Sequence, residues 1–114
     1  MRIINRSRNT VLADKAKTAD TFFSRLVGLL NRPSLKPSEG LIITPSNSIH
    51  SFFMRFTFDA IFLDRNRQVI ALTPGFKPFR VSPIYFKAIT TIELPEGAIQ
   101  ASKTQIKDEI IIIE

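Results

Sequence analysis

Short apolar runs separated by polar turns occupy most of this chain. Turns rich in Pro, Gly, Asn and Asp around short apolar runs are typical of β-strands. The runs predict strands at residues 1–5, 10–13, 41–44, 49–56, 58–63, 69–72, 85–87, 90–94 and 110–113. Several prolines interrupt residues 73–83, so we expect a loop or an edge strand there.

One segment has the spacing of an amphipathic helix. Its apolar residues recur at intervals of three and four, which places them on one helical face: Phe22, Phe23, Leu26, Val27 and Leu30. Thr18 or Asp20 could cap this helix, and Pro33 prevents it from continuing far. We expect the main helix at about residues 19–30, and a short helical turn at about 96–102 after Pro95.

These elements predict a mainly β fold at the margin of the α+β class. We expect residues 1–114 to form a single compact domain with a mostly antiparallel sheet and one main helix. So many short strands leave exposed edges unless the sheet bends, so we expect a bent or partly closed sheet.

Composition limits the chemistry that this chain can perform. There are 10 Phe, 1 Tyr and no Trp, so most aromatic rings should belong to the core. The absence of Cys excludes disulfides and thiolate sites, and the single His excludes an all-imidazole metal site within one chain. The four Gly are scattered and form no phosphate-binding loop. We therefore expect no metal and no cofactor.

The chain is basic, with a formal net charge of +6 and an isoelectric point of about 10.2. Anionic small molecules, acidic protein surfaces and nucleic acids are therefore candidate partners, although a solvated basic surface has the same composition. The sequence contains no apolar stretch of transmembrane length and no signal-peptide pattern at its start. We expect a cytoplasmic protein without a membrane partner, and the oligomeric state stays open.

Residues 47–64 mix large apolar side chains with polar groups more closely than any other segment. If residues 49–59 form a strand, His50 and Met54 share one face with three Phe, and Ser51, Arg55 and Asp59 share the other. Apolar walls with a few polar groups are typical of a ligand pocket. This segment therefore predicts a binding groove.

Seven residues are candidates for binding a ligand in that groove: His50, Ser51, Met54, Arg55, Arg32, Asp59 and Glu93. His50 could bind an anion or cap a core strand, and Arg55 could bind a carboxylate or phosphate or pair with Asp59. Arg32 and Glu93 could complete the groove or form a structural ion pair. Adjacent strand residues point to opposite faces, so His50 could not readily activate Ser51, and we expect no catalytic residue.

Three segments of this chain resemble conserved motifs of a known family. They are residues 25–32 followed by 40–43, residues 49–56 followed by 59–64, and residues 93–97. In this order and spacing they are similar to the domain of unknown function 192 family of small prokaryotic proteins. The resemblance implies a compact, mainly β domain with a helix packed on the sheet, and it carries no established activity. The chain departs from the family at Lys107, where a Gly usually precedes the final Asp and can adopt a positive φ at little cost.

The leading hypothesis is a small cytosolic binding module. It would recognise an anionic small molecule or an acidic partner at the groove on residues 47–64. The alternative is nucleic-acid binding through the basic surface, with Phe rings of the 76–80 loop stacking on bases. An acid–base enzyme that uses His50 with Asp59 or Glu93 is a third hypothesis, and the sequence offers no nucleophile or cofactor motif to support it.

Overall fold

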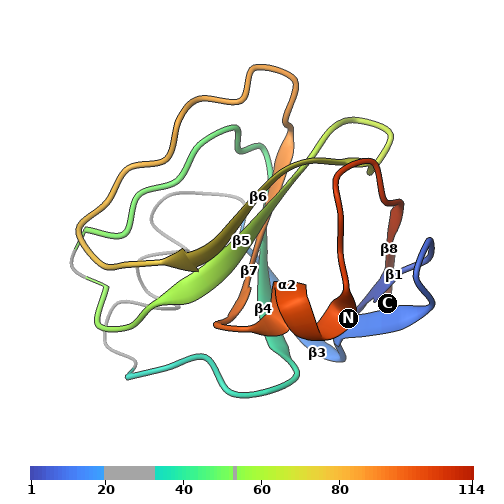
Figure 1. Cartoon of the computed structure of the whole chain (residues 1–114), viewed down its shortest axis with the longest axis horizontal. Coiled ribbons are helices and arrows are strands. Elements are labelled where there is room, and N and C mark those ends of the chain that lie inside the picture. The colour runs from blue at the N-terminus through green and yellow to red at the C-terminus, as the bar shows by residue number, and fades with distance from the viewer. Residues whose placement is uncertain (20–32, 53) are drawn as a thin grey trace.

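Two β-sheets build most of the protein in a computed structural model, which describes residues 1–19, 33–52 and 54–114 (Figure 1). The elements are β1 (Arg2–Asn5), β2 (Thr10–Ala13), β3 (Lys15–Ala19), β4 (Glu39–Ile43), β5 (Phe58–Leu63), β6 (Val69–Phe76), β7 (Thr90–Pro95), α2 (Ala98–Ser102) and β8 (Ile110–Ile113). One sheet has the antiparallel order β2-β1-β8. The other has the order β3-β4-β7-β5-β6, in which only β3 and β4 run parallel. The mainly β, mostly antiparallel fold is confirmed.

Strand β5 lies at the centre of the core because its apolar run is buried on both faces. All six residues from Phe58 to Leu63 are buried. Phe58 and Phe62 enter one apolar cluster, and Ile61 and Leu63 enter another on the opposite face. Apart from Asp59 the strand is apolar, as a strand covered on both sides requires.

The two faces of the five-stranded sheet are covered by different parts of the chain (Figure 1). On one face, Ile3, Ile99 and Ile110 bring the three-stranded sheet and α2 into the cluster that we call the helix-side core. On the other face, Ile49 and Met54 belong to the cluster that we call the loop-side core. The first half of the segment that predicted a binding groove therefore covers one face of the sheet as a loop, and its second half is β5.

Two of the predicted strands are wrong, and one strand was not predicted. Residues 49–56 turn at Met54, whose N–H donates to the Ser51 carbonyl at 3.1 Å, and residues 85–87 turn because the Ala88 N–H donates to the Tyr85 carbonyl at 2.8 Å. Strand β3 was not predicted because four of its five residues are Lys or Ala, which are uncommon in strands. Apolar content alone did not distinguish a buried loop from a strand.

The expected helices fare differently. The short helical turn at 96–102 is confirmed as α2. Its N-cap residue, Gly97, has a left-handed backbone conformation. The main helix expected at 19–30 lies outside the described residues, apart from Ala19, which ends β3. Among the described residues, no helix has both the length and the apolar content needed to cross a membrane.

Candidate functional site

Two long loops lie side by side, and the first of them contains the first half of the segment that predicted a binding groove. The first loop covers residues 44–57 and the second covers residues 77–89. They run in opposite directions and are joined by backbone hydrogen bonds: Ser46 N–H to Ile89 C=O at 3.0 Å, Tyr85 N–H to Asn47 C=O at 2.8 Å, and Ser82 N–H to Ile49 C=O at 2.8 Å. The loops therefore form a paired unit.

Ser51 fastens the two loops together. Its N–H donates to the Arg80 carbonyl at 2.8 Å, and its carbonyl accepts from the Phe79 N–H at 3.0 Å. Its hydroxyl accepts from the Arg80 N–H at 2.9 Å and donates to the Lys77 carbonyl at 2.5 Å. Ser51 is fully buried, so it shapes the second loop from inside.

His50 lies half-buried beside Ser51 and forms an isolated bridge with Val81 of the second loop. Its Nδ1 accepts a hydrogen bond from the Phe52 N–H at 3.3 Å, and its ring stacks on the Phe52 ring with centroids 5.4 Å apart. Accepting through Nδ1 requires that nitrogen to carry no proton. The hydrogen bond and the ring contact together hold the Phe52 ring in place on the surface.

Met54 and Arg55 point to different environments. Met54 is buried in the loop-side core, whereas Arg55 is exposed. The predicted ion pair between Arg55 and Asp59 is wrong, because the ion pairs among the described residues are Arg6–Glu109 and Arg8–Asp108.

Asp59 is buried against α2 and accepts three backbone N–H groups. Its Oδ1 accepts from Gly75 at 2.9 Å, and its Oδ2 accepts from Gly97 at 3.2 Å and from Ile99 at 2.9 Å. Both glycines have positive φ, at 66° and 94°. The carboxylate thus organises the end of β6 and the start of α2, where N–H groups lack partners within the helix.

Asp59 and Glu93 lie on opposite faces of the sheet. In the β5–β7 ladder, Asp59 is opposite Leu94 and Ala60 is opposite Glu93. Directly paired residues share a face and successive residues alternate, so Glu93 faces the loop side and Asp59 faces α2. Glu93 is fully buried, and Arg32 lies outside the described residues. The structure therefore does not bring the predicted carboxylates into one groove.

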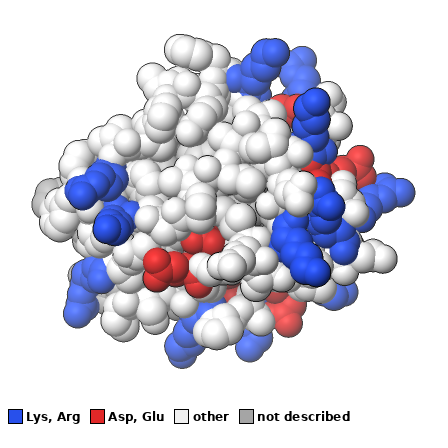
Figure 2. Space-filling model, in the orientation of Figure 1, with Lys and Arg blue, Asp and Glu red and all other residues white. Residues whose placement is uncertain are grey.

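Exposed apolar side chains gather on the loop pair. Nine large apolar side chains are exposed among the described residues, and six of them lie on these loops: Phe52, Phe79, Val81, Ile84, Phe86 and Ile89. Exposed cations accompany them: Arg55, Lys77, Arg80 and Lys87. We call these ten residues the loop-pair surface. Figure 2 shows basic and uncharged side chains, and no acidic ones, at the left edge where the loops run.

Sequence reasoning missed most of this surface because it assigned residues 85–87 to a strand and treated Phe as core. One signal was available. The chain contains no Asp or Glu between Glu39 and Asp59, or between Asp64 and Glu93. These two acid-free stretches contain the two loops.

Within residues 1–19, 33–52 and 54–114, no three His, Asp or Glu side chains group closely enough to hold an ion.

The whole chain can be compared with known proteins. Residues 3–112 match the domain of unknown function 192 family, which is described as an uncharacterized ACR. This chain belongs to that family. Members of the family resemble it over almost its entire length, so the loops and sheets described above are part of the shared domain.

Relatives are found in Thermococcus and Pyrococcus. A UPF0127 protein of Thermococcus sibiricus is 37% identical, and the match covers 95% of this chain and 72% of the relative. A UPF0127 protein of Pyrococcus horikoshii is 35% identical, with 95% and 96% covered. Neither name states an activity.

Two solved structures share the fold. A protein of unknown function from Novosphingobium aromaticivorans superposes with a TM-score of 0.81 at 19% identity, covering 97% of this chain and 82% of that chain. A protein of Sinorhizobium meliloti, provisionally described as a transcription regulator, superposes with a TM-score of 0.80 at 16% identity, covering 96% and 89%. At these identities the likeness establishes the fold alone.

Proposed function

We propose that this protein is a binding module that docks an acidic protein partner through the loop-pair surface. The observation that carries the proposal is the presence of six exposed large apolar side chains and four cations on one pair of joined loops. Phe86 is the extreme case, with 87% of its surface exposed. Large exposed apolar side chains concentrated on one part of a soluble protein mark interaction sites.

The charge of the surface favours an acidic partner. Arg55, Lys77, Arg80 and Lys87 are exposed, and neither loop contains a carboxylate side chain. A surface of one charge sign steers an oppositely charged partner and repels a basic one. Apolar contacts would then supply the main part of the affinity, as they do at buried anchor residues of other interfaces.

The loop pair is held in shape before any partner arrives. Ser51 and the backbone bonds between the loops fix the second loop, and His50 fixes the Phe52 ring. A preformed surface loses less conformational entropy on binding than a mobile one. Buried Ser51 and Met54 therefore serve binding by building the surface, while Arg55 contacts the partner.

The shape of this region favours a macromolecule over an anionic small molecule. The hollow beside the first loop, lined by Ile43 and residues 45–50, has a volume of about 250 Å³. Small-molecule pockets usually enclose about 300–1,000 Å³. A broad apolar surface suits a protein partner better than a small anion.

Nucleic acid is the competing occupant of the same surface. The exposed rings of Phe52, Phe79 and Phe86 could stack on bases. Val81 and Ile84 are also exposed but have no aromatic face to stack. Aliphatic side chains beside aromatic ones fit the apolar anchors of a protein, so we argue for a protein and test for nucleic acid.

The test is a selection of displayed peptides that combine random positions with fixed Asp and Glu. We expect acidic peptides with apolar anchors to bind, with an affinity that falls as salt rises. Phe79→Ser combined with Phe86→Ser should weaken binding by at least about 30-fold, because that is the loss expected from removing a single strong anchor residue. Arg80→Glu combined with Lys87→Glu should slow association. Fluorescence anisotropy and stopped-flow measurements give these values.

The matched control is Ile106→Ser combined with Arg65→Glu, which alters an exposed apolar residue and an exposed cation outside the loops. This variant should bind like the wild type. The proposal would be contradicted if the control lost as much affinity as the Phe79→Ser, Phe86→Ser variant, or if no acidic peptide were selected. Oligothymidylate and anionic vesicles form the remaining arms. Binding to oligothymidylate with a steep salt slope, lost on Phe79→Ser, would reassign the surface to single-stranded nucleic acid.

A further inference from the structure

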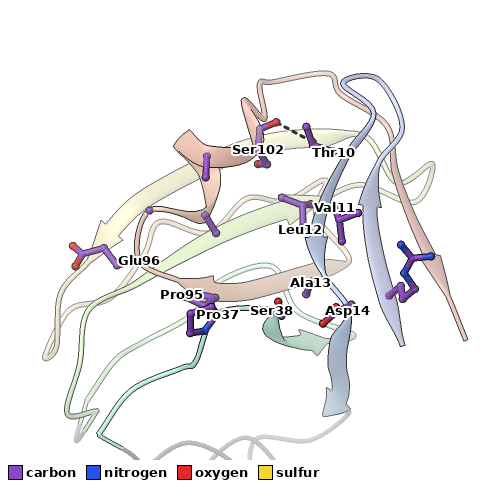
Figure 3. A pocket seen from close by; sticks show the side chains of 14 residues that line it. Thr10, Val11, Leu12, Ala13, Asp14, Pro37, Ser38, Pro95, Glu96 and Ser102 are labelled. Carbon is purple, nitrogen blue, oxygen red and sulfur yellow. Dashed lines mark hydrogen bonds between the residues drawn. The ribbon is translucent and has the colours of Figure 1, made fainter.

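A cleft on the opposite side of the sheet from the loops lies between β2, α2 and the turn after β7 (Figure 3). Its volume is about 720 Å³. Figure 3 shows β2 on one side and α2 with the Pro95 turn on the other. The Thr10 hydroxyl closes one end by donating to the Ser102 carbonyl at 2.9 Å. The cleft lies outside the loop-pair surface and shares no residue with it.

The edge of β2 borders this cleft. Thr10, Val11, Leu12 and Ala13 all line it. Successive strand residues point to opposite faces, so a hollow lined by four in a row borders the edge of the strand and not one face. Strand β2 pairs with β1 on its other edge.

The outer edge of β2 is available for pairing. In the part of the chain that the structure describes, β2 is the terminal strand of its sheet. The backbone hydrogen bonds that tie the described loops together do not involve Val11, Leu12 or Ala13. An unpaired strand edge is a template for an added strand.

The walls of the cleft are apolar with a negative bias. Val11, Pro37, Pro95 and Ala101 supply apolar surface, and Val11 is 52% exposed. The charged lining residues are Arg2, Asp14 and Glu96, so the lining carries two carboxylates and one guanidinium in a chain of net charge +6.

Two further hollows adjoin the cleft at Glu96. Their volumes are about 450 and 280 Å³, and the larger one also shares Pro37 and Pro95 and reaches Thr57 of the first loop. Adjoining hollows along the Pro95–Gly97 turn fit an elongated ligand better than a compact one.

We propose that this cleft binds an extended peptide segment of a partner protein, which adds as a strand to the outer edge of β2. The segment carries a Lys or Arg side chain that pairs with Glu96 or Asp14. Backbone hydrogen bonds to β2 supply affinity, and the apolar walls with the carboxylates supply specificity. A basic segment would be repelled by the loop-pair surface, so the two sites select partners of opposite charge.

The test is a selection of random dodecapeptides displayed on phage, with wild-type protein as bait and Ala101→Trp as counter-bait. Ala101 is exposed on α2 and lines the cleft, so an indole there fills the space without entering the core. We expect enriched peptides to alternate apolar and polar residues and to contain a basic residue. Ala101→Trp should abolish their binding, and Glu96→Gln should weaken it by about threefold. Ile106→Trp, an exposed substitution outside the cleft, should leave it unchanged.

Two further measurements decide the binding mode. A strand added to β2 donates through every second N–H only. Methylation of the nitrogens that face β2 should therefore abolish binding, and methylation of the other set should not. Amide NMR shifts should concentrate on β2 and α2. Equal enrichment on wild type and Ala101→Trp, tolerance of every pattern of N-methylation, or loss on Phe79→Ser in place of Ala101→Trp would overturn the proposal. Loss of binding on Phe79→Ser would mean that the peptide binds the loop-pair surface. This outcome would reject the cleft without rejecting the proposed function.

Discussion

At the scale of single residues, Lys107 shows how a departure from a family pattern predicts local backbone geometry. The residue before the final Asp has a φ of 77°. Its N–H donates to the Val69 carbonyl at 2.7 Å, and the Val69 N–H donates to the Asp108 carbonyl at 2.9 Å. These bonds hold Lys107 in the left-handed region, which a residue with a Cβ enters at a cost.

Lys107→Gly should therefore stabilise the protein. We expect the free energy of unfolding to rise by about 1 kcal/mol, because glycine adopts a positive φ without strain. Thermal unfolding should show an increase in Tm of about 5 °C for a chain of this size. Lys87→Gly, at an exposed residue that is not among the described residues with positive φ, is the control and should not stabilise. An unchanged or lower Tm in Lys107→Gly would contradict the strain argument.

At the scale of elements, Asp59 connects three of them. Its carboxylate lies on β5 and accepts N–H groups from Gly75 at the end of β6 and from Gly97 and Ile99 at the start of α2. The sequence offered Asp59 as a candidate groove residue and as a partner for Arg55. The register of β5 against β7 decided which face it points to, and no local pattern contains that register.

Asp59→Asn should destabilise the protein strongly. The amide group replaces one acceptor oxygen with a donor that faces backbone N–H groups, so we expect a loss of about 3 kcal/mol in the free energy of unfolding. Asp64→Asn is the matched control, because a single Asp64 oxygen accepts the N–H groups of Asn66 and Gln68 in a turn. Its loss should stay below about 1 kcal/mol. Urea unfolding of both variants measures the difference, and equal losses would remove the organising role of Asp59.

At the scale of the whole molecule, a polar cluster ties the two ends of the described chain together. The buried side chain of Asn5 donates to Thr104 at 3.0 Å and to Asp108 at 2.9 Å. Arg8 donates to the same Asp108 oxygen at 3.1 Å, as does the Gln105 N–H at 2.8 Å. The cluster thereby joins the β1–β2 turn to the segment before β8.

The pKa of Asp108 reports on this cluster. Burial raises the pKa, but hydrogen bonds from Arg8, Asn5 and Gln105, with the charge of Arg8, outweigh it and lower the pKa below its usual 3.8. A lowered pKa in the folded state means that the carboxylate stabilises the fold above the unfolded pKa. That contribution is lost as the pH falls through the folded pKa.

Asp108→Asn should therefore lower the free energy of unfolding by about 2 kcal/mol at pH 7. The gap in unfolding free energy between the variant and the wild type should narrow as the pH falls below about 4. Urea unfolding at pH 7, 5, 4 and 3 measures the gap. Glu109→Gln removes an exposed partner of Arg6 and serves as the control, with an effect below about 1 kcal/mol. A gap that stays constant across this pH range would show that Asp108 does not couple protonation to folding.

The sequence alone determined the family, the mainly β class and most strands, because these depend on local periodicity and turn residues. Phe58 to Leu63 is predictable in this way, since a run that is apolar apart from Asp59 indicates a strand buried on both faces. Tertiary structure decided the rest. It turned residues 49–56 into a loop joined to residues 77–89, it placed Asp59 and Glu93 on opposite faces, and it exposed Phe79 and Phe86. Pairing register and the exposure of an apolar residue depend on segments distant in the chain, and therefore no local pattern records them.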